Sequence, residues 1–252
     1  MTEPRPGEAR SVDDPTSSVL ALRTTPTAAG PIRHVDAGDD AAIVLLHGED
    51  ASPDYWRDYV PTFAQAFRVL APELPDDIGA AERFERVSAL LDALGSDRVA
   101  LVGHGVGGAT ALELAARLPR VGALVLVDAI LTGTEQADVA SLGAREDVHA
   151  LLVWGEDDDR SPVADAERLA DALPMSALAT IPGAGHDMPL EEPATLVPLL
   201  FEWLRFRYLG RSHRHEQEGP VLVTLGRRPT MTEEGIDDLI DDAQGSVEED
   251  GG

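Results

Sequence analysis

The stretch of sequence that decides the fold is Arg98-Val-Ala-Leu-Val-Gly-His-Gly-Val-Gly-Gly-Ala-Thr-Ala-Leu-Glu-Leu-Ala-Ala-Arg-Leu118. Residues 98–102 form a short apolar run, which is typical of a buried β-strand, and residues 109–118 carry Ala and Leu at helical packing positions. The glycines between the two segments permit a tight turn and a close approach of the helix to the strand. A strand, a tight turn and a helix in this order predict one unit of an α/β sheet.

The turn between these two segments has the form of a nucleophile elbow that lacks its nucleophile. Residues 103–107 match the pattern G-x-S-x-G except that Gly105 stands in place of the serine. In that pattern a strained turn lifts the serine above the sheet edge beside a histidine. We expect no substitute hydroxyl at the apex, because Thr110 lies more than one helical turn further on and Ser52 belongs to another loop. Gly105 therefore marks a vacated nucleophile position.

Three further segments fit the same architecture and appear in a fixed order. They are Ile43-Val-Leu-Leu-His-Gly48, Ala150-Leu-Leu-Val-Trp-Gly-Glu-Asp-Asp158 and Pro182-Gly-Ala-Gly-His186, the last followed by Leu190-Glu-Glu-Pro193. Together with the elbow, these motifs resemble the α/β-hydrolase superfamily, in particular its branch of esterases, C–C hydrolases and dehalogenase-like enzymes with a G-H-S-x-G-G elbow. The resemblance covers about residues 20–208 and has the chain order nucleophile, acid, histidine.

The resemblance implies a role for each matching residue. Asp158 would be the acid that orients the catalytic histidine, and His186 would be the base. The backbone N–H groups of Glu49 and Val106 would form the oxyanion hole, which needs no particular side chain. Glu49 departs from the small or apolar residue usual there, and its carboxylate would repel developing negative charge unless it points into solvent. Both His47 and His104 are interpreted as structural residues.

The resemblance also implies an α/β fold with a mostly parallel central sheet and helices on both faces. In this branch a helical cap several dozen residues long follows the strand that ends near Asp128. Here only residues 129–148 are available, enough for one short helix, so we expect a minimal, vestigial cap and an open, shallow site. Loss of the cap removes contacts that set specificity and exclude water.

The sequence predicts four segments: a disordered lead-in at residues 1–17, one hydrolase-fold domain at 18–209, a C-terminal extension at 210–243 and an acidic disordered tail at 244–252. Within the domain, hydrophobic periodicity predicts strands and helices. The strands are expected at Val19–Thr24, Pro31–Val35, Ala42–His47, Phe67–Ala71, Arg98–Val102 and Val121–Val127, and the helices at Pro53–Ala66, Ala80–Leu94, Ala109–Leu118 and Pro193–Tyr208. The extension contains a basic cluster near residues 205–215, a strand-like run at Pro220–Leu225 and a capping box that opens a short helix at Thr230–Ala243.

The charge of the chain is extreme, with 46 acidic residues, 20 arginines, no lysine and a formal net charge of −26. Self-repulsion of this size destabilises a compact state at low salt, and concentrated salt screens it. A salt-rich, halophilic cytoplasm is the preferred interpretation, and an acidic partner-binding surface is the alternative. The acidic surface disfavours nucleic acid as a partner.

Other classes of site and location are disfavoured by composition. The absence of cysteine excludes disulfides, thiolate nucleophiles and Cys-ligated metals. We expect neither a cofactor nor a metal, because the acidic run Glu156–Asp159 is better explained as a solvated loop. No long apolar segment or signal peptide is present, so the chain is expected to be cytoplasmic, with no membrane partner.

Three functional hypotheses remain open. The first is a hydrolase-fold protein that has lost covalent hydrolysis and binds an acyl or carbonyl compound or a protein. The second is an active enzyme in which His186 and Asp158 act as a general base without a covalent intermediate. The third is an interaction protein that docks a protein partner through residues 211–243, against which stands the alternative that this extension folds back on its own domain.

Overall fold

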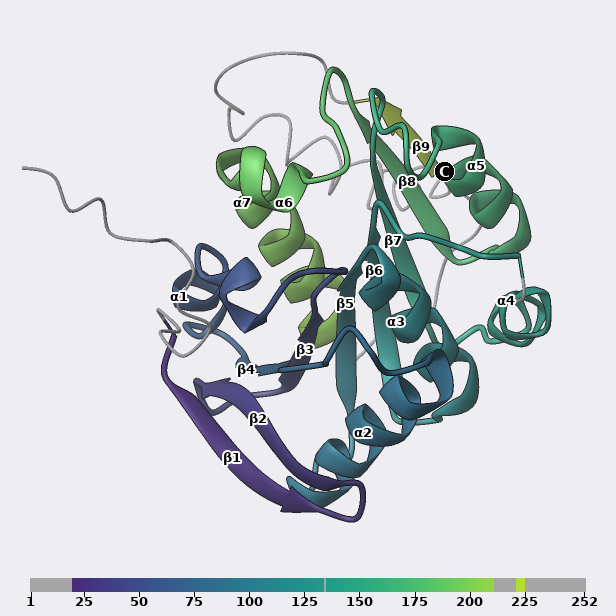
Figure 1. Ribbon diagram of the computed structural model, residues 1–252. Coiled ribbons are helices and arrows are strands. Elements are labelled where there is room, and N and C mark those ends of the chain that lie inside the picture. The colour runs from purple at the N-terminus through teal and green to yellow at the C-terminus, as the bar shows by residue number, and fades with distance from the viewer. Residues whose placement is uncertain (1–19, 134, 211–220, 225–252) are drawn as a thin grey trace, which may run out of the picture.

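A nine-stranded sheet forms the centre of the molecule in a computed structural model that describes residues 20–133, 135–210 and 221–224. The strand order is β1-β2-β4-β3-β5-β6-β7-β8-β9 (Figure 1). β2 pairs antiparallel with β1 and with β4, and all other neighbouring strands are parallel. The strands are β1 (Leu22–Thr27), β2 (Gly30–Ala37), β3 (Ala42–Leu46), β4 (Arg68–Pro72), β5 (Val99–His104), β6 (Val121–Val127), β7 (His149–Gly155), β8 (Ser176–Ile181) and β9 (Val221–Thr224).

Helices cover both faces of the sheet. The helical segments are η1 (Pro53–Trp56), α1 (Val60–Phe63), α2 (Ala80–Ala93), α3 (Val106–Arg117), α4 (Gln136–Gly143), α5 (Val163–Ala172), α6 (Met188–Glu191), α7 (Pro193–Leu204) and η2 (Arg205–Leu209). Side chains of α2, α3, α4 and α5 share one hydrophobic cluster, and those of η1, α1, α6 and α7 share the other. In Figure 1, α2, α3 and α5 lie on one side of the sheet, and α1, α6 and α7 lie on the other. β5 contributes Leu101 to the first cluster and Val102 to the second. Burial on both faces explains why the central strands are continuous apolar runs.

The predicted fold class, a mostly parallel sheet with helices on both faces, is confirmed. The single helix predicted at Pro53–Ala66 is wrong, because the structure has two short helices there, η1 and α1. Pro61 explains the break: it has no N–H to donate to the backbone oxygen of Arg57, so a helical hydrogen-bond ladder cannot continue from η1 through this position. Pro61 is instead accommodated in the first turn of α1.

Several boundaries also differ from the predicted ones. The elbow helix begins at Val106, three residues earlier than expected, because Gly107 and Gly108 have helical backbone despite the low helix propensity of glycine. The last helix of the domain ends at Leu204 and continues as a π-helical turn through Leu209. The first strand lies three residues later than expected.

The short connection after β6 contains one helix, α4, which lies on the flank of the domain. It contacts α3 and α5, and Leu142 buries its side chain in the cluster on that face. Arg117 on α3 donates two hydrogen bonds to the Asp138 carboxylate, at 2.9 and 3.2 Å. In Figure 1, α4 lies at the outer edge of the molecule beside these two helices. Within the described part of the connection, the helix therefore packs beside the sheet.

The strand-like run of the C-terminal extension is β9, which pairs in parallel with β8 at the edge of the sheet. The helix expected at Thr230–Ala243, the lead-in 1–17, the tail 244–252 and most of the basic cluster lie outside the described residues.

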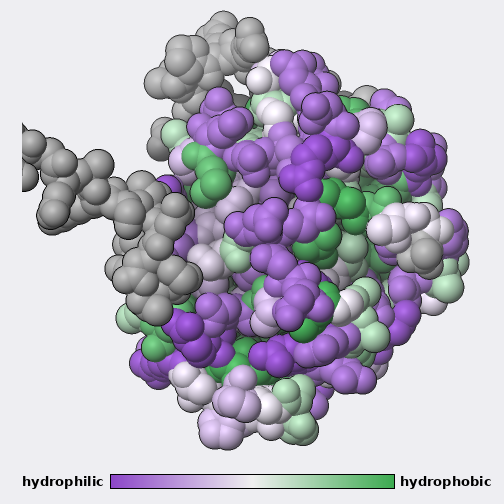
Figure 2. All heavy atoms as spheres, viewed as in Figure 1, coloured by the Kyte–Doolittle hydropathy of each residue, from purple (hydrophilic) through white to green (hydrophobic). Residues whose placement is uncertain are grey.

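On the face shown in Figure 2, hydrophilic residues predominate and hydrophobic ones form small separate patches. Leu190 and Phe206 are the two large hydrophobic side chains of the described residues that are exposed. None of the helices in the described ranges is long and apolar enough to cross a membrane.

Candidate active site

Gly105 forms the apex of a tight turn between β5 and α3. Its backbone has φ 54° and ψ −125°, a conformation that side chains disfavour. Glycine is also required for packing on either side of the apex. A Cβ on Gly103 would lie 2.4 Å from the carbonyl oxygen of Gly107, and a Cβ on Gly107 would lie 2.4 Å from that of His47. The turn is thus pressed against the end of β3 and has the geometry of a nucleophile elbow.

The structure brings the predicted acid and base together. Asp158 follows β7 and His186 follows β8, and Nδ1 of His186 lies 2.8 Å from Oδ2 of Asp158. The other carboxylate oxygen, Oδ1, accepts hydrogen bonds from the backbone N–H groups of Arg160 at 2.8 Å and Ser161 at 3.0 Å. With Oδ2 on Nδ1, the carboxylate orients the imidazole and leaves Nε2 free to exchange a proton.

The free nitrogen of His186 faces the apex of the elbow. A Cβ built on Gly105 would lie 3.6 Å from Nε2 of His186 and 3.4 Å from Cα of Gly48, which are ordinary van der Waals distances. A side chain at position 105 would therefore fit beside the base. The His186–Asp158 pair thus lies beside the apex of the elbow, and the one element of a triad that is missing is the hydroxyl.

His104 supports His186 from beneath the elbow. Its Nε2 lies 2.8 Å from the backbone oxygen of His186 and donates a hydrogen bond to it, and its ring stacks on Tyr55 at 4.9 Å between centroids. Burial lowers the pKa of His104 to about 3, so the ring is neutral. His47 is likewise buried and bridges its turn: Nδ1 donates to the Gly48 oxygen, and Nε2 accepts from the Leu74 N–H.

The openness of the site stays a prediction, but the predicted acid and base within it are largely buried. Gly105 is buried, and His186 and Asp158 are 7% and 6% exposed. The reason is local packing: His104 and Asp158 enclose the imidazole of His186, and Tyr55 covers His104 from the other side. Water is therefore largely excluded from the His186–Asp158 pair, although α4, the helix in the place of a cap, packs on the flank of the domain.

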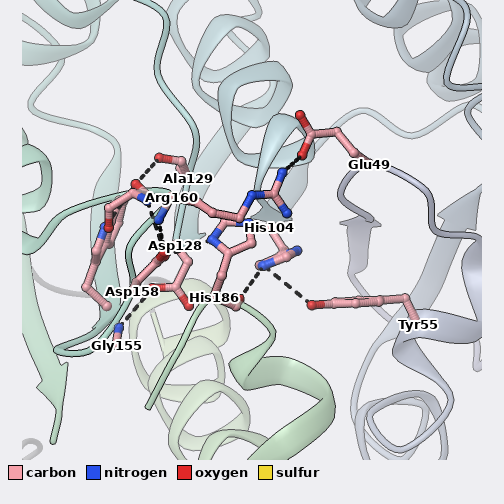
Figure 3. A network of polar contacts seen from close by, with 11 residues as sticks. Glu49, Tyr55, His104, Asp128, Ala129, Gly155, Asp158, Arg160 and His186 are labelled. Atoms are coloured by element: carbon pink, nitrogen blue, oxygen red, sulfur yellow. Dashed lines mark hydrogen bonds and ion pairs between the residues drawn. The ribbon is translucent and has the colours of Figure 1, made fainter. Parts of the chain in front are cut away.

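The two predicted oxyanion donors flank the turn. Within residues 20–133 and 135–210, the N–H groups of Glu49 and Val106 donate no hydrogen bond to another residue. The carboxylate of Glu49 forms an ion pair with the guanidinium of Arg160, which extends from the acid loop toward it (Figure 3). Both side chains are partly exposed, at 37% and 49%. The negative charge at Glu49 is therefore compensated by a neighbouring cation.

The two other hydroxyls considered from the sequence are engaged away from the apex. Thr110 donates its hydroxyl hydrogen to the Val106 oxygen, 3.0 Å away within α3. Ser52 caps η1 by accepting a hydrogen bond from the N–H of Asp54 at 3.4 Å. The described residues place neither hydroxyl at the nucleophile position.

Sequence reasoning missed Asp128, which lies beside Asp158 behind the base (Figure 3). It is fully buried, has φ 44°, and accepts a hydrogen bond on Oδ1 from the Gly155 N–H at 2.8 Å. Burial, and then the neighbouring Asp158, raise its pKa to about 8. The available signal was its position: it follows β6 at the same sheet edge at which β7 delivers Asp158.

Residues 43–147, from β3 to the segment after α4, match the model of the alpha/beta hydrolase family. This segment contains the elbow, and the fold around it is the one this family has. Residues 43–147 are therefore similar to the alpha/beta hydrolase family, and the described domain has the α/β-hydrolase fold. The predicted resemblance to this family is thereby confirmed, whereas the catalytic roles of Asp158, His186 and the two oxyanion donors remain predictions.

Two relatives illustrate the extent of the sequence similarity. An uncharacterized protein of Mycobacterium tuberculosis is 32% identical over 206 residues, which are 75% of this chain and 56% of that protein. A 2-hydroxy-6-oxo-6-phenylhexa-2,4-dienoate hydrolase of Burkholderia cepacia is 33% identical over 107 residues, which are 36% of this chain and 37% of that enzyme. The chain spans about half or less of the length of these relatives.

Solved structures agree with this family at the level of the fold. A predicted CIB-like hydrolase from Thermoplasma acidophilum superposes with a TM-score of 0.66 and 21% identity, covering 74% of this chain and 98% of that one. A meta-cleavage product hydrolase from Pseudomonas fluorescens IP01 gives a TM-score of 0.65 at 16% identity, covering 73% and 97%. The arrangement of strands and helices is thus that of α/β-hydrolases.

Proposed function

We propose that this α/β-hydrolase-fold protein binds a small acyl or carbonyl compound at Gly105 without covalent capture, and that His186 and Asp158 act on it as a general base. The observation that carries the proposal is the contact between His186 and Asp158: Nδ1 of His186 is 2.8 Å from Oδ2 of Asp158, and Nε2 faces position 105. A buried histidine held in this way can take a proton from water or from a ligand carbon.

Without a nucleophile, the proposed reaction would have no covalent acyl-enzyme intermediate. Gly105 has no hydroxyl, and Thr110 and Ser52 are engaged elsewhere, so no acyl-enzyme bond would form at the apex. In the proposed route His186 removes a proton from water, the water oxygen attacks the carbonyl carbon, and the proton passes to the leaving group. The N–H groups of Glu49 and Val106 would stabilise the oxyanion that develops.

Ligand binding without turnover is the second candidate, and the glycine at the apex favours it. General base catalysis alone contributes about 10²–10⁴-fold, well below what a complete triad provides. A site of this kind could serve as a binding or regulatory module that retains the shape of a hydrolase. The two candidates differ in whether His186 moves a proton during a catalytic cycle.

Turnover and covalent labelling distinguish these possibilities. The chain is assayed in concentrated salt with p-nitrophenyl esters and with 2-hydroxy-6-oxo-6-phenylhexa-2,4-dienoate, the compound in the name of the Burkholderia cepacia relative. The general-base proposal expects slow turnover that follows the ionisation of one group, is lost in His186→Ala, and leaves no label from a fluorophosphonate probe.

Each other outcome has a defined meaning for the proposal. Saturable binding of these compounds with no turnover supports the binding module and refutes the catalytic role of His186. Labelling by the fluorophosphonate would show a nucleophile that the proposal denies. Turnover that survives His186→Ala would also overturn it, because another group would then be the base.

A further inference from the structure

Asp128 presents a buried carboxyl group whose hydrogen bonding is incomplete. Its side chain has no exposure, and its Oδ1 accepts the N–H of Gly155 at 2.8 Å. Its Oδ2 is buried and has no donor among the described residues. A buried carboxylate oxygen without a donor is unfavourable, whereas a protonated oxygen is itself a donor and needs only an acceptor.

The carboxylate of Asp158 lies beside the side chain of Asp128 (Figure 3), and a carboxylate can accept a hydrogen bond from a protonated carboxyl group. A carboxylate offers about four lone-pair sites. Three on Asp158 are filled: Oδ1 accepts the N–H groups of Arg160 and Ser161, and Oδ2 accepts from Nδ1 of His186. An O–H from Asp128 would complete the set.

The distribution of donors decides which carboxyl group carries the negative charge. Two carboxylates in contact in a buried site cannot both ionise at low cost, so one of them keeps a proton. Asp158 receives three N–H donors, which stabilise its charged form, and Asp128 receives one. The proton therefore belongs on Asp128, and its raised pKa of about 8 agrees with this assignment.

Among the described residues, the charged side chains that act most strongly on Asp128 are carboxylates, which disfavour its ionisation. The groups that act on it electrostatically include Asp158 and Asp187, both acidic, and Tyr55 lies near enough for its own pKa to be raised in part by Asp128. Arg160, on the acid loop, is engaged by Glu49. The backbone of Asp128 is also held in place, because its N–H donates a hydrogen bond to the Val153 oxygen at 3.0 Å.

We propose that Asp128 is a positioning residue that holds a proton on Oδ2 and donates it in a hydrogen bond to Asp158, so that the two carboxyl groups behind His186 carry a single negative charge. Asp128 touches no ligand and acts through Asp158. It fixes the orientation of the acid and limits the negative potential at the imidazole. The inference concerns the resting state of the site and does not depend on turnover.

The test follows the ring resonances of His186 by NMR from pH 5 to pH 10 in the wild-type chain and in Asp128→Asn. Asparagine keeps the oxygen that accepts from Gly155 and an N–H that donates to Asp158, tolerates positive φ and does not titrate. At pH 6 we expect the same His186 chemical shifts in both proteins. Near pH 8 the wild type should show a second inflection, caused by ionisation of Asp128, that is absent from Asp128→Asn.

Asp128→Ala provides the matched loss of the donor. Without the hydrogen bond, Asp158 holds more negative charge and favours the imidazolium, so the midpoint of the His186 titration should rise by about 0.5–1 pH unit. A purely structural Asp128 would lower stability in the alanine variant and leave the titration of His186 unchanged in both variants. Identical His186 profiles in wild type and Asp128→Asn from pH 6 to pH 10 would overturn the inference, as would a second inflection that persists in Asp128→Asn.

Discussion

Introducing the missing hydroxyl by Gly105→Ser should create hydrolytic activity in a site that is otherwise assembled. The Cβ of the new residue would lie 3.6 Å from Nε2 of His186, and the Oγ is one bond further, within hydrogen-bonding reach for a suitable rotamer. Because pairing a nucleophile with a positioned base contributes about 10²–10⁴-fold, we expect ester hydrolysis to increase by about that factor over the parent chain. The positive φ of position 105 should lower the free energy of unfolding by about 1–3 kcal/mol.

Ester hydrolysis by Gly105→Ser is measured beside two controls and a labelling assay. Gly105→Ala carries the same backbone strain without a hydroxyl, so its stability should match that of the serine variant and its activity that of the parent. Adding His186→Ala should remove the gained activity. The serine variant should react with a fluorophosphonate probe. A folded Gly105→Ser protein that neither turns over esters nor takes the label would refute the view that His186 and Asp158 are poised toward position 105.

Further predictions concern stability, the ion pair and the packing of the turn. Asp128 holds its proton in the folded state up to about pH 8 and loses it near pH 3.8 when unfolded, so its contribution to stability falls as pH rises through this window. In chemical denaturation between about pH 5 and 7, the free energy of unfolding of Asp128→Asn should therefore rise relative to that of wild type by roughly 1 kcal/mol per pH unit. A difference between the two free energies that does not change with pH would contradict a protonated Asp128. In the Gly105→Ser background, Arg160→Gln should reduce kcat/KM, by less than about tenfold, because it leaves the charge of Glu49 uncompensated, whereas Glu49→Gln should not reduce kcat/KM. Because the ion pair is exposed, either change should alter the free energy of unfolding by less than about 1 kcal/mol. Gly107→Ala should destabilise by at least about 1–3 kcal/mol, since its Cβ would lie 2.4 Å from a backbone oxygen, whereas Gly79→Ala, with nothing within 4 Å, should cost a few tenths; equal effects in thermal melts would disprove the packing argument. Raising NaCl from about 0.1 to 2 M should raise Tm, because salt screens the net charge of −26, and a salt-independent Tm would count against the halophilic interpretation.

The order of strands and helices was predictable from the sequence because hydrophobic periodicity and glycine placement are local signals. The apolar runs at β3, β5, β6 and β7 and the glycines of the elbow determined the type of fold. The region from Pro53 to Ala66 was predicted wrongly because its apolar spacing fits one helix, while a single proline within it divides the segment. Such a break depends on one missing N–H, which a periodicity argument averages over.

The site was predictable to the extent that its residues belong to recognisable motifs. Asp158 and His186 stand in such motifs, and the structure places them in contact. Asp128 and the partnership of Glu49 with Arg160 could not be predicted, because they arise from residues 30 or more positions apart that meet only at the sheet edge. The burial of the His186–Asp158 pair was missed for the same reason. It results from the packing of Tyr55 against His104, and the length of the cap carries no information about that contact.

The tight packing of Gly103 and Gly107 makes the shape of the elbow independent of the residue at its apex. Neither glycine has room for a Cβ, whereas position 105 has ordinary contact distances around it. The backbone of the turn is thus held by its flanks, and the apex can gain or lose a side chain without a change of fold. Serine and glycine codons can differ by a single base, so a chain of this kind stands one mutational step from a complete triad. Covalent chemistry at this site would be reversible on an evolutionary timescale, with the scaffold preserved in either direction.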